Sequence, residues 1–286
     1  MLRTMERISL ACFLFSSACT HASTPAPQPR ASLDPTALEV VERTALRAIL
    51  QEEGVSGTIA LLREEEREVV CSDVVLCQQR VLPASTFKIA NALIGLETGV
   101  IADADFVIPW DGVQREFADW NRDHTLRSAI AASAVPYFQE LSRRVGAARE
   151  AHWTRALVYG NGDTGSAARV DEFWLEGPLA ISAVEQVSFL RRFARGELPV
   201  SSRSLAVVRA ILVLAEHDGT VLRGKTGWAR PHQRDQHGWF VGFVERGHER
   251  AYVAVLVRPG PGQDDASFLS ARRRVAEHAL SSLSAW

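Results

Sequence analysis

Lysine is nearly absent from this sequence of 286 residues. Only Lys88 and Lys225 occur among its 32 basic residues, so arginine supplies almost all of the ordinary surface positive charge. An amine can lose its proton at accessible pH, whereas a guanidinium effectively cannot. A lysine kept in such a sequence is therefore a candidate for a position that needs an amine. A compositional accident is the alternative interpretation.

The sequence also lacks an excess of either charge and any long hydrophobic run in its body. Its 34 acidic and 32 basic residues leave a formal charge of −2, which argues against a nucleic-acid-binding protein with a basic face. The 47% share of hydrophobic residues is ordinary for a folded chain and argues against wholesale disorder. No later segment is long and apolar enough to span a bilayer, so we expect no stable membrane insertion.

The N-terminus has the pattern of a secretory signal peptide. Arg3 and Arg7 precede an apolar run at 8–15 and small residues at 16–18. We expect a cleaved leader at about 1–22, a Pro-rich linker at 23–31 and a single catalytic domain at 32–286. Such a protein is exported, and in a bacterium it is periplasmic. Lipidation at Cys19 is the less favoured alternative, because the preceding residues lack the aliphatic residue usual for a lipobox.

Cysteine is scarce, and only Cys71 and Cys77 lie beyond the leader region. In an oxidising compartment this pair can bridge a tight hairpin, with two free thiols as the alternative. The histidines are scattered, and no Cys/His spacing is typical of a zinc site, so we expect no metal.

The order of the expected elements indicates the fold class. We expect a helix from Asp34-Pro35 to Ile49, and then strands at 57–62 and 68–71. Helices follow at 87–96, 125–132, after Pro136, at 182–194 and at 205–215. Strands at 221–228, 238–244 and 252–257 and a helix at 268–283 complete the chain. This order predicts an α/β protein of the α+β type: an antiparallel sheet built from both chain ends, flanked by helices, with a mainly helical region inserted.

Ser85 and Lys88 form the first candidate for chemistry. Positions three apart lie on one helix face, so the hydroxyl and the amine are neighbours. The helix N-terminus and burial among apolar residues both disfavour a charged amine. A neutral amine beside a hydroxyl is a general base that activates a serine nucleophile.

Lys225 lies in the second candidate, Lys225-Thr226-Gly227, on an expected strand. The amine and the threonine suit a carboxylate, and the glycine lets a ligand approach the backbone. This motif alone is a weak signal. Together with Ser85 and Lys88 it marks the serine penicillin-recognising enzymes.

Further motifs make the resemblance specific. They are PASTFKIANALIGLETGVI at 83–101, Ser133-Ala134-Val135, Tyr159-Gly160-Asn161, FWLEG at 173–177 and KTGW at 225–228. In order and spacing, from about residue 34 to 280, the chain resembles the class D serine β-lactamases, the oxacillinases. The resemblance implies the fold of serine β-lactamases and penicillin-binding transpeptidases and a β-lactam substrate. It implies no cofactor, apart from carbon dioxide or bicarbonate to carboxylate Lys88.

The resemblance also implies a role for each motif residue. Ser85 is the nucleophile, Lys88 as N6-carboxylysine is the general base, and Trp174 hydrogen-bonds its carbamate. Ser133, helped by Lys225, relays a proton to the lactam nitrogen, and Val135 walls the carbamate pocket. Thr226, Gly227 and Trp228 line the substrate strand, and the Trp228 and Ser85 backbone N–H groups form the oxyanion hole. Tyr159 shapes the pocket.

Some assignments stay open. Among the arginines at 272–274, Arg272 is the candidate for binding the substrate carboxylate, with Arg230 as its rival. Taken singly, Ser133 could be a helix cap, Trp174 a core residue and the motif at 159–161 a turn. A penicillin-binding peptidase or a β-lactam sensor that acylates without turnover is the alternative function. A monomer and a homodimer are both compatible with the sequence, and the substrate spectrum depends on loops at 110–124 and 228–238.

Overall fold

Strands from both ends of the chain share one sheet in the computed structural model, which describes residues 38–230 and 236–283. The expected leader at 1–22, the linker at 23–31 and Cys19 lie outside the described residues. No helix within the described ranges is long and apolar enough to cross a membrane.

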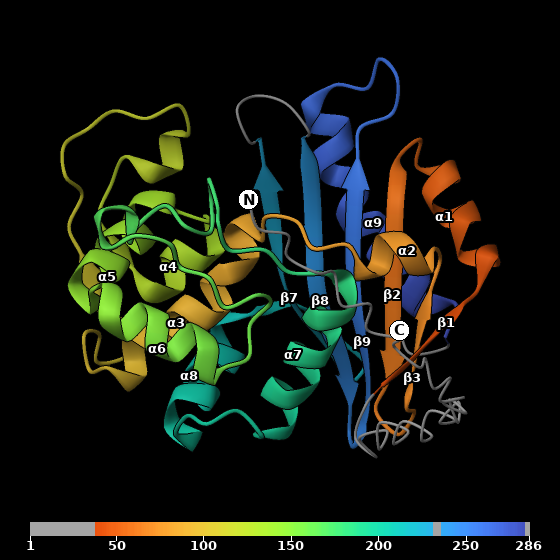
Figure 1. Ribbon diagram of the computed structural model, residues 1–286, viewed down its shortest axis with the longest axis horizontal. Coiled ribbons are helices and arrows are strands. Elements are labelled where there is room, and N and C mark those ends of the chain that lie inside the picture. The colour runs from red at the N-terminus through yellow and green to blue at the C-terminus, as the bar shows by residue number, and fades with distance from the viewer. Residues whose placement is uncertain (1–37, 231–235, 284–286) are drawn as a thin grey trace, which may run out of the picture. The chain divides into compact units, whose positions relative to one another are not determined.

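In the described part of the chain, seven strands lie side by side in the order β1-β3-β2-β9-β8-β7-β6 (Figure 1). Their bounds are Glu39–Glu42 (β1), Ser56–Arg63 (β2), Glu68–Cys71 (β3), Val213–His217 (β6), Thr220–Ala229 (β7), His237–Arg246 (β8) and Glu249–Arg258 (β9). All neighbours are antiparallel except β1 and β3, which are parallel. A separate pair, β4 (Val107–Ile108) and β5 (His124–Thr125), closes the loop between them.

The two faces of the sheet build separate cores, because alternate residues of a strand point to opposite faces. On β9, Val253 and Val255 pack with α1 (Arg47–Glu52) and α9 (Asp265–Ser281). Ala254 and Leu256 belong to the core on the other face, which includes α3 and α7 (Figure 1).

The helices between β3 and β6 form the inserted region. They are α2 (Val74–Gln78), α3 (Lys88–Glu97), α4 (Leu126–Ala131), α5 (Val135–Val145), α6 (Ala147–Ala156), α7 (Ala183–Arg195) and α8 (Ser202–Ile211). Short 3₁₀ helices occur at η1 (Thr44–Leu46), η2 (Ala84–Phe87), η3 (Ala118–Trp120) and η4 (Ala167–Arg169). The predicted fold class, an antiparallel sheet flanked by helices with a helical insertion, is confirmed.

Local signals that combine a cap with a periodic pattern are confirmed. Ser182 and Glu185 form the expected capping box of α7, each side chain bonding the other's backbone N–H. The helix α3 is buried from Lys88 to Leu96, as its nearly continuous apolar sequence predicts.

The helix expected from Asp34 to Ile49 begins outside the described residues, at 34–37, and is wrong at 39–42. Residues 39–42 instead form β1, whose Glu39 N–H donates to the Arg67 carbonyl at 2.8 Å, and only Arg47–Glu52 is α-helical. The β-branched pair Val40-Val41 suits a strand, and the free edge of β3 supplies its partners.

The helix expected at 205–215 is also wrong at its end, because it stops at Ile211. Val213–His217 is the edge strand β6, which pairs with β7 through a two-residue turn, Asp218-Gly219. Both turn residues have positive φ, +46° and +74°, as a type I′ hairpin requires. The Asp-Gly pair is therefore a hairpin signal.

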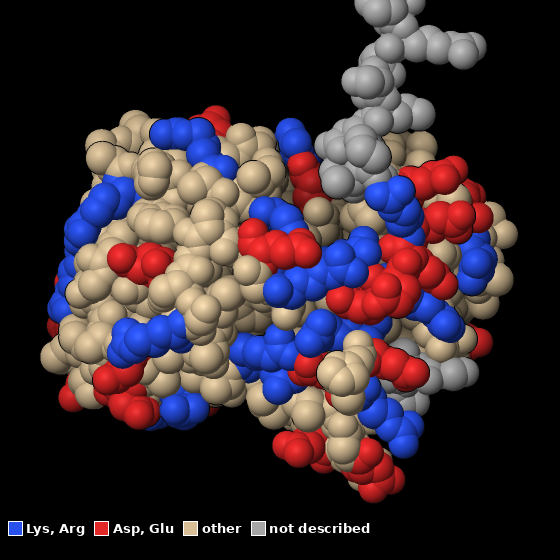
Figure 2. Space-filling model, turned by 90° about the horizontal axis from the view of Figure 1, so that it is seen from below, with Lys and Arg blue, Asp and Glu red and all other residues tan. Residues whose placement is uncertain are grey.

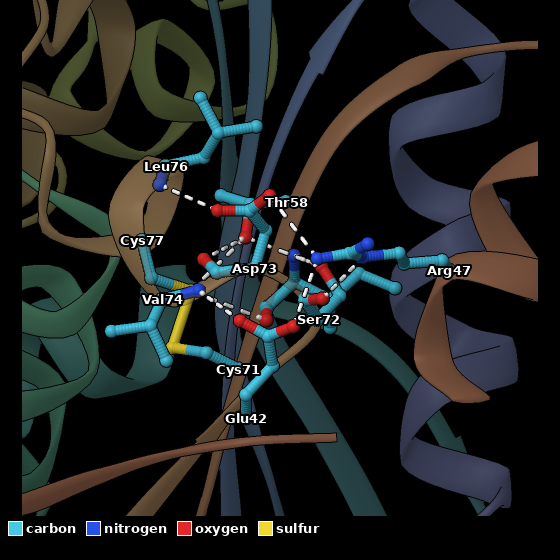
Figure 3. A network of polar contacts seen from close by, with 10 residues as sticks. Glu42, Arg47, Thr58, Cys71, Ser72, Asp73, Val74, Leu76 and Cys77 are labelled. Carbon is cyan, nitrogen blue, oxygen red and sulfur yellow. Dashed lines mark hydrogen bonds and ion pairs between the residues drawn. A yellow bond between two sulfur atoms is a disulfide. The ribbon is translucent and has the colours of Figure 1, made fainter. Parts of the chain in front are cut away.

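A disulfide joins Cys71 at the end of β3 to Cys77 in α2, with Cα atoms 6.3 Å apart (Figure 3). The bridge connects a strand to a helix, not the two arms of the hairpin that was expected. Nearby, Arg47 donates to the Ser72 carbonyl at 2.8 Å and to the Glu42 carboxylate at 2.9 Å. These contacts connect β1 and α1 to the segment after β3, which leads towards Ser85.

Arginine meets carboxylates over the surface. Glu172 accepts from Arg169 at 2.9 Å, and Glu140 accepts from Arg144 at 2.8 Å. On the face drawn in Figure 2, basic and acidic side chains are interspersed. Exposed pairs of this kind each contribute about 1 kcal/mol or less.

Loss of the Cys71–Cys77 bridge is expected to destabilise the fold. Closing so short a loop contributes about 2 kcal/mol in the chain-entropy account. The Cys71→Ala/Cys77→Ala variant should therefore unfold roughly 4–8 °C lower in calorimetry. Added reductant should lower the midpoint of the wild type but not that of the variant. An unchanged wild-type midpoint in reductant would contradict the expectation.

Candidate active site

Ser85 lies in the 3₁₀ turn η2, which leads directly into α3. The preceding Ala84 has a φ of +48°, which residues other than glycine rarely adopt, and its N–H donates to the Trp174 carbonyl at 3.0 Å. The Thr86 hydroxyl donates to the Pro83 carbonyl at 2.8 Å. Backbone strain of this kind persists where the surrounding structure fixes it. The turn therefore holds the Ser85 hydroxyl in one place at the start of the helix.

Four predicted side chains from three separate segments meet at this point. Lys88 Nζ lies 2.6 Å from Ser85 Oγ and 3.3 Å from Ser133 Oγ. Lys225 Nζ lies 3.0 Å from the same Ser133 oxygen. The Ser133 hydroxyl thus bridges the two lysines. A continuous path with proton-transfer distances runs from Ser85 through Lys88 and Ser133 to Lys225.

Both lysines are buried, with exposed fractions of 0% for Lys88 and 5% for Lys225. Burial lowers the pKa of Lys88 well below its ordinary value, and the nearby Lys225 lowers it further. Burial, with a contribution from Arg272, lowers the pKa of Lys225 to about 7. The lowered pKa of Lys88 favours the neutral amine that a base requires, and the pKa of Lys225 lies near neutral pH.

Ser133 connects α4 to α5 and has a φ of +51°. Its carbonyl accepts a hydrogen bond from Lys88 Nζ at 3.0 Å. Helix α4 ends at Ala131 and the following helix begins at Val135, with Pro136 in its first turn, so residues 132–134 separate the two helices. In this left-handed conformation, both the carbonyl and the hydroxyl of Ser133 lie near the lysine.

The strand β7 packs closely against η2, the turn that carries Ser85, because residue 227 is glycine. A Cβ atom there would lie 3.0 Å from the Pro83 carbonyl oxygen and 3.1 Å from Thr86 Cγ2. One residue earlier, the Thr226 carbonyl accepts from Lys225 Nζ at 3.1 Å. The absence of a side chain at Gly227 therefore permits the approach that places Lys225 opposite Ser85.

Arg272 and Arg230 have different environments. Arg272, from α9, donates to the Gly227 carbonyl at 2.7 Å, and its Nε has no partner among the described residues. Burial lowers the pKa of Arg272 to about 10. Arg230 instead stacks on the Trp228 ring at 4.0 Å and lies 3.8 Å from Glu116. Arg272 is thus the arginine that hydrogen-bonds the backbone of β7, whereas Arg230 lies over the Trp228 ring.

Trp174 is fully buried, and its indole N–H has no hydrogen-bond partner within the described ranges. The ring stacks on Phe87, the residue before Lys88, with centroids 5.6 Å apart. The Phe138 ring lies 5.5 Å from Lys88 Nζ. An unpaired buried N–H costs about 1–3 kcal/mol, so this site favours a group that offers an acceptor oxygen.

The Tyr159-Gly160-Asn161 motif contacts the turn that carries Ser85. The Tyr159 hydroxyl lies 3.2 Å from Thr86 Oγ1, and Gln186 Nε2 donates to that threonine oxygen at 2.8 Å. The Asn161 amide donates to the Pro178 carbonyl at 3.0 Å. Sequence reasoning missed Gln186, whose signal is a glutamine on the apolar face of α7.

Two further aromatic residues that sequence reasoning missed lie beside residues of the site. The Phe117 ring lies 4.6 Å from the Trp120 ring and 6.5 Å from the Trp228 ring. The Trp120 indole donates to the Ala132 carbonyl at 3.1 Å, next to Ser133. They lie in the loop at 110–124, where no periodic pattern indicates which side chains face the site.

Comparisons with known proteins agree with this site. The family model for the penicillin binding protein transpeptidase domain matches residues 65–280. The chain is 39% identical to the β-lactamase OXA-48 of Klebsiella pneumoniae, over 73% of this chain and 78% of that protein. The solved class D β-lactamase YbXI from Nostoc is 36% identical with a TM-score of 0.79, covering 84% of this chain and 99% of its own. The C-terminal domain of the Bacillus licheniformis BlaR penicillin-receptor is 30% identical with a TM-score of 0.79, covering 89% and 99%.

Replacing Lys225 with methionine is expected to stabilise the fold while removing a residue of the site. The unfolded chain holds the lysine proton up to its ordinary pKa of 10.5, whereas the folded state releases it at about 7. The buried charge therefore costs most stability below pH 7, and the cost fades as the pH rises towards 10.5.

Thermal unfolding at several pH values checks this. The Lys225→Met midpoint should exceed that of the wild type most at acidic and neutral pH. The exposed Arg122→Met serves as the charge-matched control and should show no such gain. A Lys225→Met midpoint below the wild type at every pH would contradict the expectation.

Proposed function

Because this chain belongs to the penicillin-binding protein transpeptidase domain family, and within it to the class D serine β-lactamases, we propose that it hydrolyses the β-lactam amide bond of penicillins and related antibiotics. The activity would confer resistance to them. The observation that carries the proposal is the 2.6 Å approach of Ser85 Oγ to the buried Lys88 Nζ.

Acylation begins when Ser85 Oγ attacks the lactam carbonyl carbon and gives its proton to the base at Lys88. The Ser85 and Trp228 backbone N–H groups would bind the developing oxyanion, at about 3 kcal/mol per donor. The C–N bond then breaks as Ser133 donates its proton to the departing lactam nitrogen. Lys225, 3.0 Å from the Ser133 hydroxyl, can replace that proton.

The residues around Lys88 fit a carbamate made from carbon dioxide and the neutral amine. The unpaired indole N–H of Trp174 offers a hydrogen-bond donor to a carbamate oxygen. Val135 would wall the pocket and limit water there. When present, the carbamate supplies the general base for both halves of the reaction. Water then attacks the ester carbonyl, which releases the product and restores the Ser85 hydroxyl.

The substrate carboxylate would bind between β7 and α9. Thr226 and Lys225 supply a hydroxyl and a compact charge from the strand. Arg272 adds a guanidinium that is already fixed by its bond to the Gly227 carbonyl at 2.7 Å. Trp228 would cover the bound antibiotic at the rim.

A second function has a specific observation in its favour. A β-lactam sensor, or a penicillin-binding peptidase, would acylate Ser85 and then turn over poorly. The C-terminal domain of the BlaR penicillin-receptor has the same TM-score, 0.79, as the class D enzyme from Nostoc. We also propose export to the periplasm by the leader at 1–22, and a monomer or homodimer as the working form.

Turnover of a chromogenic β-lactam separates the two functions. The wild type should release many product molecules per chain, faster with added bicarbonate because Lys88 is then more fully carboxylated. Lys88→Ala should keep its circular dichroism spectrum but accumulate acyl-enzyme, with deacylation slower by roughly 100-fold or more. Lys88→Arg should be more damaging than the matched change Lys225→Arg. One stoichiometric burst without turnover, with or without bicarbonate, would favour the sensor.

Two arginine variants test the carboxylate site. Arg272→Ala should raise KM roughly 10-fold or more, because it removes a charged hydrogen-bonding partner of the substrate. Arg230→Ala, the matched control, should change KM less, because that side chain contacts Trp228 and Glu116. Steady-state kinetics with a penicillin checks the order, and the reverse order would move the assignment to Arg230.

A further inference from the structure

A second buried polar cluster includes a residue of α3, the helix that carries Lys88. The proposed hydrolysis does not use this cluster. It consists of Asn91 on α3, Ser142 on α5, and Glu150 and Thr154 on α6, all with an exposed fraction of 0%. The Asn91 side-chain amide donates to Ser142 Oγ at 2.9 Å. This bond connects α3 to α5, and the effect of the Ser142 hydroxyl on the pKa of Glu150 places α6 beside them.

Most oxygen atoms of this cluster are unpaired. Asn91 Oδ1, both carboxylate oxygens of Glu150 and Thr154 Oγ1 have no hydrogen-bond partner in the part of the chain that the structure describes. All four are acceptors, and the hydroxyl hydrogens of Ser142 and Thr154 are too few to serve them. A buried carboxylate without partners is among the costliest groups in a protein interior.

We propose that Asn91, Ser142, Glu150 and Thr154 form an internal site that binds water, with Glu150 in its neutral, proton-bearing form as one wall. A buried water molecule typically makes about three hydrogen bonds. It would donate two, to Asn91 Oδ1 and Thr154 Oγ1, and accept one from the Glu150 carboxyl O–H. This arrangement pairs three of the four oxygens without burying a charge, and the second Glu150 oxygen is left to the Ser142 hydroxyl.

Water fits the site better than a metal ion does. Glu150 is the one carboxylate in the cluster, and the described residues hold no group of three or more His, Cys, Asp or Glu side chains that could bind a metal. Calcium takes about six to eight oxygen ligands, more than this cluster offers.

The electrostatics agree with a neutral Glu150. Burial raises its pKa to about 8, and the Ser142 hydroxyl and the Arg149 guanidinium oppose this only in part. Of the described charged groups on these helices, Arg149 alone shifts that pKa. The other titratable side chains on the three helices are Lys88, Glu97, Tyr137, Glu140, Arg143, Arg144, His152 and Arg155.

A proton bound this tightly makes stability depend on pH. The pKa of Glu150 is about 8 in the folded state against the ordinary 4.5, so the contribution is complete below pH 4.5 and is lost as the pH rises through 8. Above that pH the buried charge would loosen α6 from α3. Because α3 also carries Lys88, this loosening would alter the position of Lys88 relative to Ser85.

Thermal unfolding of the full chain between pH 4.5 and 8 tests the proton. Glu150→Gln keeps the size and hydrogen-bonding capacity of the side chain but cannot ionise. Its midpoint should match the wild type at the acidic end and exceed it by roughly 5 °C or more at the alkaline end. The control Glu176→Gln, on an exposed carboxylate, should follow the wild type. Parallel curves for Glu150→Gln and the wild type would overturn the proposal.

Two direct measurements test the bound species. Infrared spectra at neutral pH should contain the C=O stretch of a protonated carboxylic acid that is missing from Glu150→Gln. Nuclear Overhauser contacts should connect water to the Asn91 side-chain amide. Loss of either signal in the wild type would refute the site. If the midpoint of thermal unfolding differs between added sodium and added potassium, the bound species is a cation and not water.

Discussion

The placement of two buried amines around one hydroxyl is the constraint on which the rest of the site depends. Lys88 and Lys225 both lie within hydrogen-bonding reach of Ser133 Oγ, at 3.3 Å and 3.0 Å. Two positive charges that are this close together and buried away from water repel each other strongly. The arrangement therefore requires that at least one amine be neutral. The left-handed Ser133 and the missing side chain at Gly227 both serve this juxtaposition. The fold thus gives up stability at this point for a base that works at neutral pH.

The part of this site that the sequence predicts from residue spacing alone is the local part. The spacing of Ser85 and Lys88 on one helix is enough to indicate an activated serine, and the rarity of lysine marks both amines. The capping box at Ser182 is predicted for the same reason, and so are the strands expected at 57–62, 68–71, 221–228, 238–244 and 252–257, since each pattern depends on neighbours within a few residues. The motif order then indicates the family and the fold class.

What sequence reasoning missed depends on contacts between distant segments. The edge strands β1 and β6 form because β3 and β7 offer free hydrogen-bonding groups, and no local pattern announces those partners. Gln186 supports Thr86 from 100 residues away. Phe117 and Trp120 come from the loop at 110–124, whose course is set by tertiary contacts. They contact Trp228 and Ala132 beside the site. The same limit explains why Arg272 and Arg230 could be separated only in three dimensions.

The near absence of lysine has a practical side. Amine-directed reagents normally modify many surface lysines of a protein, whereas both lysines here are buried, with exposed fractions of 0% and 5%. Any lysine adduct on this chain must therefore lie within the catalytic centre. The extent of modification would then report how often that centre opens to solvent, without any residue having to be replaced.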